Sequence, residues 1–553
     1  MKWQKLAKLT TVALAAATIL AACGSNNSGS GSSSTSSSAA KQVLTRMEGD
    51  VISTMDTSVM TDAISGQAAV DTMDGLYRYN GATLEPAIAT KIVEPTNEGK
   101  TYTYKLRKDA KWSNGDAVTA ENFVYAWQRT VDPATKSQYA YLYSGIKNAD
   151  DIMNGKKEAS TLGVSAKDSH TLVVELEHAI PYFKTMVVNP AFFPQNQEVV
   201  EKYGDKYGTS SDKVVYNGPF KLTKWTGTNN SWSEVRNKSY WNAKAVKLDE
   251  VKVQVVKDSS TALNLFQSGK MDDVTISGET AQQMKNDPSY KPLAQATVFY
   301  LELNEKKVPA FKNEKVRQAI SKAINRKEFV NNVLGDSSIP AANLTPQNLA
   351  QTPDGTDFSK AAAKNAGNST KYDAAEAKKL WTEGLKEAGV SSLNLEYLTD
   401  DSEGAKKSAE YFQSQLEKNL PGLKLTISTV PFKSRLTRSE NGDFDIVMTA
   451  WGADFPDPIT FLDLFTSDNS YNNGKWNSPE YDQLIQASKT TDVTDEDARA
   501  QDLLKAQEIL TKEQGIVPIY QRAQGHLINS KIKNLAYSPA NMYNFVHTYI
   551  AGK

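Results

Sequence analysis

The sequence has very little cysteine and histidine, and neither basic nor acidic side chains are in excess. A single cysteine among 553 residues excludes an intrachain disulfide and any cysteine-rich zinc or iron–sulfur site. Four histidines leave few ligands for a metal ion, so we expect no metal and no other cofactor. The 63 basic and 64 acidic residues give a formal net charge of -1, which argues against a nucleic-acid partner.

Long apolar runs are also missing, except at the N-terminus. Three lysines precede the apolar residues 9–22, a stretch shorter than the ~20 residues of a spanning helix. This order predicts a signal peptide over residues 1–22. It ends in Leu20-Ala21-Ala22-Cys23, which resembles the lipobox of bacterial lipoproteins, so we expect Cys23 to be lipidated. The alternative, a buried odd cysteine, does not explain why Cys23 ends the apolar run.

A tether is predicted directly after this signal. Residues 24–40 contain only small and polar side chains, mainly Ser and Gly, which is typical of a flexible linker. Residues 23–40 are therefore expected to be a lipidated cysteine and a Ser/Gly-rich tether. We expect the rest of the chain to fold at the outer face of the cell membrane, held there by lipid. A bacterium with one membrane needs such an anchor, so a Gram-positive source is expected.

The body of the chain mixes strand and helix patterns. Residues 101–107 place Tyr102, Tyr104 and Leu106 on one face, which predicts a half-buried strand. Residues 120–131 carry an apolar stripe at helical spacing after Thr119, a suitable N-cap. Other strands are expected at 171–177, 251–255 and 444–450, and other helices at 313–334 and 373–389. This interspersion predicts a mixed α/β (α+β) fold, and the length corresponds to roughly three to four domain-sized units.

Ten segments then resemble, in the same order, the family 5 extracellular solute-binding proteins, the peptide and oligopeptide receptors of ABC importers. The resemblance runs from about residue 42 to the C-terminus and is strongest to OppA-type members. The segments are residues 85–89 (EPAIA), 101–107 (TYTYKLR), 111–116 (KWSNGD), 118–127 (VTAENFVYAW), 217–220 (NGPF), 240–241 (YW), 262–266 (ALNLF), 316–326 (VRQAISKAINR), 451–454 (WGAD) and 517–520 (VPIY).

The resemblance implies a two-lobed periplasmic-binding-protein-like fold with an additional small domain and a hinge between the lobes. Lobe I would combine residues 41–82, 212–297 and 527–553. The additional domain would be 83–211, and lobe II would be 298–526.

The resemblance also implies a function. The protein would capture oligopeptides in a cleft between the lobes and deliver them to the permease of an ABC transporter, working as a monomer. Such a receptor recognises mainly what all peptides share, the backbone amides and the charged termini. No enzyme is expected, because the sequence has no P-loop, no dinucleotide fingerprint, no nucleophile elbow and no His-Glu-x-x-His.

One acidic residue carries the main site prediction. By resemblance to OppA-type members, Asp454 receives the α-ammonium group of the peptide. Its alternative role is to cap a turn. The nearby Asp457 directly precedes Pro458, which is typical of a helix N-cap, so we expect it to be structural.

The same resemblance places further residues in the cleft. Ala450, Trp451, Gly452 and Ala453 would supply backbone pairing and a wall. Ala63 and Ile64 would belong to a second strand beside the peptide. Tyr300 and Tyr139 are candidate cleft aromatics, or ordinary packing residues. Arg438 would meet a ligand carboxylate, although Met448 stands where some relatives carry another arginine.

Two other functions stay open at this point. In the first, the protein is still a receptor but binds a specific signalling peptide or another solute. Alternatively, the lipoprotein is a surface adhesin or chaperone whose cleft no longer binds a ligand.

Overall fold

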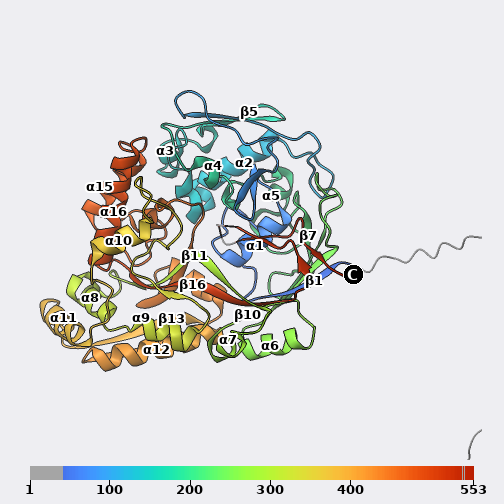
Figure 1. The fold of residues 1–553 in the computed structure, drawn as a ribbon. Helices are drawn as coiled ribbons and strands as arrows, with labels where there is room; N and C mark the ends of the chain where they lie inside the picture. The colour runs from blue at the N-terminus through green and yellow to red at the C-terminus, as the bar shows by residue number, and fades with distance from the viewer. Residues whose placement is uncertain (1–40, 539, 541, 553) are drawn as a thin grey trace, which may run out of the picture. The chain divides into compact units, whose positions relative to one another are not determined.

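The computed structural model describes residues 41–538, 540 and 542–552 (Figure 1). The predicted signal peptide, Cys23 and the tether lie outside the described residues. Within the described part of the chain, no helix is long and apolar enough to cross a membrane.

A mixed sheet of eleven strands is the largest element. Its strand order is β14-β13-β15-β11-β16-β10-β1-β9-β8-β7, and β12 pairs with β16. The strands are β1 (Val43–Glu48), β7 (Phe220–Thr223), β8 (Ser231–Arg236), β9 (Glu250–Val255), β10 (Asp273–Ile276), β11 (Tyr290–Leu303), β12 (Ile339–Pro340), β13 (Leu393–Asp400), β14 (Leu423–Val430), β15 (Ile446–Gly452) and β16 (Val517–Ile528).

The two longest strands of this sheet, β11 and β16, connect its two halves. They run antiparallel, and their register shifts between Ala294 and Val298. The first part of β11 pairs only with β16, which continues to β10, whereas the second part also pairs with β15. β11 and β16 together therefore run through both halves of the sheet. One half contains β10, β1 and β9, and the other contains β15, β13 and β14. This arrangement gives a curled sheet and confirms the predicted mixed α/β class.

Helices cover this sheet and fill the connections, as Figure 1 shows for α6, α7 and α12. They are α1 (Ala63–Thr72), α2 (Ala120–Val131), α3 (Ala149–Met153), α4 (Phe183–Met186), α5 (Gln197–Tyr203), α6 (Ser259–Gln267), α7 (Gly278–Met284), α8 (Glu314–Lys322), α9 (Arg326–Glu328), α10 (Phe358–Ala366), α11 (Ala374–Glu387), α12 (Glu403–Asn419), α13 (Phe432–Glu440), α14 (Ile459–Leu462), α15 (Pro479–Lys489) and α16 (Glu496–Lys512).

A separate three-stranded sheet lies within residues 83–211, in the order β4-β6-β5. Its strands are β4 (Thr101–Lys105), β5 (Val164–Asp168) and β6 (Thr171–Glu175). Tyr102 and Tyr104 of β4 are buried, as their alternation predicts. Helix α2 begins after Thr119, whose backbone N–H donates to the Asn122 side chain at 3.1 Å. The predicted strand and helix are both confirmed here.

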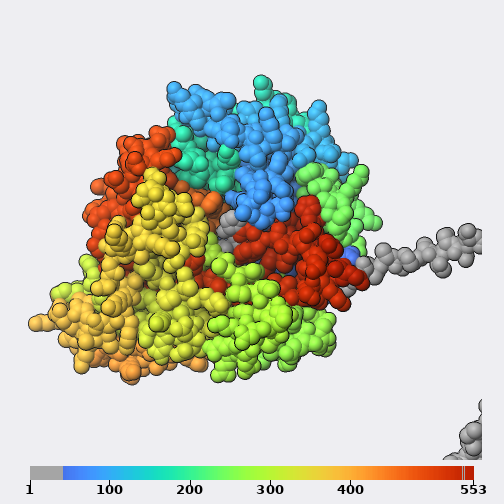
Figure 2. Space-filling model, in the orientation of Figure 1, coloured from blue at the N-terminus to red at the C-terminus, as the bar shows by residue number. Residues whose placement is uncertain are grey.

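The remaining strands form short pairs. A hairpin joins β2 (Tyr77–Asn80) and β3 (Thr83–Pro86). Near the C-terminus, β17 (Ile532–Lys533) pairs with β20 (Tyr549–Ile550), and β18 (Ala536–Tyr537) pairs with β19 (Tyr543–Asn544). On the face in Figure 2, this C-terminal segment (red) lies between blue N-terminal residues and the green residues of α6 and α7.

The apolar cores join segments that are far apart in the sequence. One cluster contains Leu44, Val251 and Phe545, from three separate stretches of the chain. Another extends from the β4-β6-β5 region into the segment that follows β15, where the rings of Tyr182 and Phe455 stack at 4.9 Å. Residues after β15 are therefore fixed against residues of the 83–211 region.

One helix predicted from the sequence does not form as a single helix in the structure. Residues 313–334 are not continuous, because α8 ends at Lys322, and α9 and a π-helical turn follow. Asn325 interrupts the helix since its side chain accepts from the Glu328 backbone N–H at 3.2 Å, starting a new helix. The helix predicted at 373–389 is confirmed as α11, with Asp373 accepting from the Glu376 N–H at 3.0 Å.

Candidate ligand-binding cavity

A cavity of about 620 Å³ lies between α1, β11, β15, α13 and the loops that follow β15. It is within the size range of small-molecule sites. Nine of the ten predicted ligand-binding residues line it: Ala63, Ile64, Tyr139, Tyr300, Ala450, Trp451, Gly452, Ala453 and Asp454. The structure therefore brings together residues that are almost 400 positions apart in the sequence.

Asp454 follows β15 and is almost completely buried, with 9% of its surface exposed. Its carboxylate accepts hydrogen bonds from the Asn189 amide at 2.7 Å, the Thr460 hydroxyl at 3.0 Å and the Tyr139 hydroxyl at 3.1 Å. Among the described residues, no basic side chain forms an ion pair with it. Burial raises the pKa of Asp454 to about 7, although these hydrogen bonds oppose the rise.

The strand that leads to Asp454 has one unpaired edge. On one side, β15 pairs with β11 over its whole length, from Ile446 to Gly452. On the other side, β13 pairs only with Ile446 and Val447. Within the described residues, the edge from Met448 to Gly452 has no strand partner, and these residues line the cavity. Such an edge presents backbone N–H and C=O groups that an extended chain can bind.

Aromatic side chains form a wall next to Asp454. The ring of Trp451 contacts that of Tyr471 at 4.6 Å and that of Tyr139 at 5.8 Å. Tyr300 is also buried and packs edge-on against Phe465 at 5.5 Å. Trp451, Tyr139 and Tyr300 therefore pack against other aromatic rings and also line the cavity.

Asp457 has the structural position expected from its sequence. Its carboxylate accepts from the Ile459 N–H at 3.0 Å, at the start of α14, and forms an ion pair with Arg499 at 2.7 Å. Asp457 is absent from the cavity lining, whereas Asp454, three residues earlier, is part of it.

The predicted strand at Ala63 and Ile64 is wrong. Both residues begin α1, because the Asp62 side chain accepts from the Ser65 N–H at 2.8 Å and caps the helix. They still line the cavity.

Arg438 lies outside the cavity lining. Its guanidinium forms ion pairs with Glu396 at 2.8 Å and Asp443 at 2.9 Å. Arg435, one helical turn earlier on α13, lines the cavity instead. The sequence contains both arginines but no signal that tells which one faces inward.

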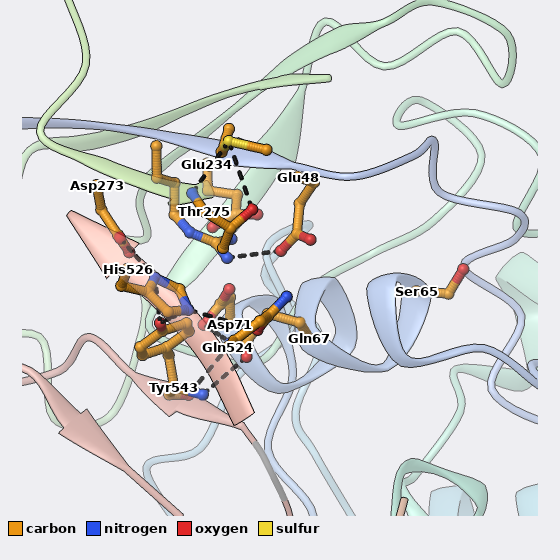
Figure 3. A network of polar contacts seen from close by, with 12 residues as sticks. Glu48, Ser65, Gln67, Asp71, Glu234, Asp273, Thr275, Gln524, His526 and Tyr543 are labelled. Carbon is orange, nitrogen blue, oxygen red and sulfur yellow. Dashed lines mark hydrogen bonds and ion pairs between the residues drawn. The ribbon is translucent and has the colours of Figure 1, made fainter. Parts of the chain in front are cut away.

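A network of polar side chains occupies another part of the cavity wall (Figure 3). It lies between α1, β1 and β16, where Arg46 pairs with Glu48 at 2.6 Å and His526 with Asp273 at 2.8 Å. Asp71 is buried as well, and burial raises its pKa although the charge of Arg46 opposes the rise. The polar side chains in this part of the wall are thus mostly partnered within the protein.

Sequence reasoning missed several residues of the site. Asn189, Thr460 and Tyr471 contact Asp454 or its aromatic wall but lie in loops or short helices without a distinctive pattern. Asn189 and Tyr471 line the cavity because of tertiary contacts, whereas Thr460 reaches Asp454 through the local turn after β15.

A family model and known proteins match most of the chain. The model "Bacterial extracellular solute-binding proteins, family 5 Middle" matches residues 83–473. The dipeptide-binding protein of Lactococcus lactis subsp. cremoris is 37% identical over 514 residues, covering 90% of this chain and 92% of that protein. The structure of Listeria monocytogenes OppA bound to peptide has a TM-score of 0.88 at 38% identity, covering 93% of this chain and 100% of that one.

One further solved structure superimposes less well on this protein as a whole. The unliganded open form of the murein tripeptide-binding protein MppA has a TM-score of 0.60 at 30% identity, although it covers 93% of this chain and 98% of that one. The present arrangement of segments is therefore more similar to the peptide-bound structure than to that open form.

Proposed function

Because this chain belongs to the bacterial extracellular solute-binding proteins of family 5, we propose that it captures peptides in this cavity and delivers them to an ABC permease. The family assignment agrees with the ordered motifs in the sequence, and the fold is that of two-lobed OppA-type binding proteins. The relative from Lactococcus is a dipeptide-binding protein, and the OppA from Listeria was solved with a bound peptide.

The unpaired edge of β15 is the observation that carries this proposal. An extended peptide laid along Met448 to Gly452 adds a strand to the sheet, so that its backbone amides bond to the receptor whatever its sequence. Side chains of the peptide then point away from the strand into the cavity. This binding mode suits a receptor that must accept many sequences.

Asp454 at the end of this edge supplies the charged contact. Its carboxylate has three neutral donors and no cationic partner among the residues that the structure describes, so it is well placed to receive an ammonium group. We propose that the α-ammonium of the peptide forms an ion pair with Asp454. This contact fixes which end of the peptide lies at Gly452.

Closure of the cavity is proposed to accompany binding. Two donors to Asp454, Asn189 and Tyr139, come from the region 83–211, whereas Asp454 belongs to the segment after β15. A peptide that contacts both regions favours the closed arrangement over the open one. The lobes I and II proposed from the sequence would then move relative to each other about β11 and β16.

We also propose that the protein acts as a lipid-anchored monomer. Cys23 would carry the lipid, and residues 24–40 would tether the folded body to the outer face of the cell membrane. No catalytic activity is proposed, since transport requires only binding and release.

The test is to identify what the protein carries. The full chain is purified in mild detergent and denatured, and the released small molecules are identified by mass spectrometry. We expect a mixture of short peptides with free N-termini, depleted in an Asp454→Asn variant. A single dominant peptide would indicate a signalling role instead, and no bound peptide, together with no uptake from a peptide mixture, would contradict the proposal.

A further inference from the structure

Two loops meet at the edge of the cavity, although the strands that lead to them lie in different halves of the large sheet. One loop joins β9 to α6, and the other joins β13 to α12. In the strand order, β9 and β13 are separated by β15, β11, β16, β10 and β1. Figure 1 shows α6 and α12 on the same side of the sheet. Lys257 and Asp258 of the first loop, and Ser402 and Glu403 of the second, border the cavity.

Lys257 makes the main contact between the two loops. Its ammonium group pairs with Asp401 of the second loop at 2.5 Å and with Asp50, which follows β1, at 2.7 Å. Partial burial lowers the pKa of Lys257, but the hydrogen bonds and charges of the two carboxylates outweigh burial and raise it. The charged lysine is therefore held between one acid of its own half of the sheet and one acid of the other half.

Backbone groups add to this contact. The carboxylate of Glu403 accepts from the Ser259 N–H, at the start of α6, at 3.2 Å. In return, the Glu403 N–H donates to the carbonyl of Lys257 at 3.2 Å. A second lysine also connects the two halves, because Lys433 on α13 donates to the carbonyl of Ser53 at 3.2 Å. All these bonds join the proposed lobe I to the proposed lobe II.

The contact lies away from the strands that connect the two halves. In the sheet, β9 is three strands from β16, and β13 is two strands from β11. At about 4.8 Å between neighbouring strands, the two loops lie roughly 10–15 Å from β16 and β11 across the sheet. A rotation about β11 and β16 therefore moves the loops apart, and an ion pair is lost beyond about 4 Å. The pair between Lys257 and Asp401 thus belongs to the closed arrangement.

A contact that forms only in the closed arrangement stabilises that arrangement without touching the peptide. We propose that Lys257 is a latch: by bridging Asp50 and Asp401, it keeps the cavity closed and slows the release of the peptide. Lys257 is then a positioning residue, which acts on the peptide through the closed arrangement. This inference rests on the proposed function, because a latch matters only if a bound peptide leaves when the cavity opens.

The two acids give the latch a second property. Both carboxylates contact the same ammonium group, so the contacting oxygens of Asp50 and Asp401 are about 5 Å apart at most. Without the lysine, two negative charges face each other between the halves and repel. Removing Lys257 therefore favours opening more than removing the charge of Asp401 does.

The experiment measures how fast peptides leave. The full chain in mild detergent is loaded with short random-sequence peptides, diluted and filtered after different times, and the peptides that stay bound are quantified by mass spectrometry. The variants are Lys257→Met, Lys257→Arg, Asp401→Asn and the double variant Lys257→Met/Asp401→Asn. Lys424→Met is the matched control, because Lys424 of β14 pairs with Glu417 of α12 within one half. Thermal unfolding checks folding, and small-angle scattering of the peptide-free protein measures opening.

We expect Lys257→Met to release peptides about threefold to tenfold faster than the wild type, with a larger radius of gyration when peptide-free. Lys257→Arg and Lys424→Met should stay within about twofold of the wild type. Asp401→Asn alone should accelerate release by about twofold to fivefold, yet adding it to Lys257→Met should slow release again because the repulsion is removed. Raising the salt from about 0.05 M to about 0.5 M should accelerate release from the wild type more than from the double variant, because Lys257 and Asp401 are partly exposed.

Two results would overturn the latch and leave peptide binding intact. One is equal release from the wild type and from folded Lys257→Met. The other is a double variant that releases peptides faster than Lys257→Met, because the two acids would then not repel. Wild-type protein that retains no peptide at any time would instead contradict the proposed function.

Discussion

The Asn189 amide donates a 2.7 Å hydrogen bond to the carboxylate of Asp454, across 265 positions of sequence. Asn189 also caps the short helical turn at residues 190–192 by accepting from the Ala191 N–H at 2.9 Å. The Asn189 side chain is therefore held by two hydrogen bonds, one to Asp454 and one from the Ala191 N–H. The bond links the region 83–211 to the end of β15, so we expect the protonation state of Asp454 and the proposed closure of the cavity to depend on each other.

Replacing Asp454 with asparagine should weaken the binding of peptides with a free α-amine by about 2–3 kcal/mol, or roughly 30- to 150-fold. The reason is the loss of the charge that pairs with the ammonium. N-acetylated peptides of the same sequence should bind both forms equally. Isothermal titration calorimetry measures both differences, and equal losses for the two peptide forms would contradict an ion pair at Asp454.

Peptide affinity should rise with pH up to about 7. The pKa of Asp454 is raised to about 7 in the ligand-free protein, and an adjacent ammonium should lower it. Binding then releases a proton below pH 7, so affinity falls by up to about tenfold per pH unit as the pH drops. Above about pH 8 it should fall again, because the α-amine loses its proton. Calorimetry in buffers of different ionisation enthalpy measures the released proton, and Asp454→Asn should release less.

The stability of the ligand-free protein should depend on pH through the same group. The folded-state pKa of about 7 exceeds the ordinary value of 3.8, so the folded protein binds an extra proton between these values. The contribution of Asp454 to the free energy of unfolding is therefore present below about pH 4 and is lost as the pH rises towards 7. Its upper limit is about 4 kcal/mol.

Urea unfolding of the wild type and of Asp454→Asn at several pH values isolates this contribution. Burial also raises the pKa of Glu302 and Glu305 to about 7 and raises that of Asp71, so the wild type alone does not separate these groups from Asp454. We expect the difference in stability between variant and wild type to grow in favour of the variant from pH 4 to 7. A constant difference would contradict the raised pKa.

Asp457 provides a contrast to Asp454. Its replacement by alanine removes the bond to the Ile459 N–H and leaves Arg499, which is mostly buried, without its partner. We expect a loss of about 3 kcal/mol in stability, with peptide affinity almost unchanged below the unfolding temperature. Thermal unfolding and calorimetry on the same sample measure the two effects. Strong loss of affinity in the folded variant would show that Asp457 takes part in the site.

Much of the fold follows from local sequence patterns. The alternation around Tyr102 and Tyr104, the cap at Thr119 and the Asp373 cap each depend on residues within one element, so the sequence alone predicts them. The ordered motifs likewise identify the family and point to Asp454 and its neighbours Ala450 to Ala453. Local patterns failed at Asn325, whose side chain competes with the backbone and breaks a predicted helix. The resemblance failed at Ala63 and Ile64, where it implied a strand but Asp62 caps a helix.

Tertiary structure alone decided how the site is completed. The donors Asn189 and Tyr139 reach Asp454 only because separate segments fold against each other, and no spacing in the sequence records this contact. The same holds for the two arginines of α13. Both sit on one amphipathic helix, but Glu396 and Asp443 hold Arg438 outside the cavity lining, while packing buries Arg435 in the cavity wall. Sequence determines the family and the elements, whereas the charges that face a ligand depend on which acids the folded chain places beside each base.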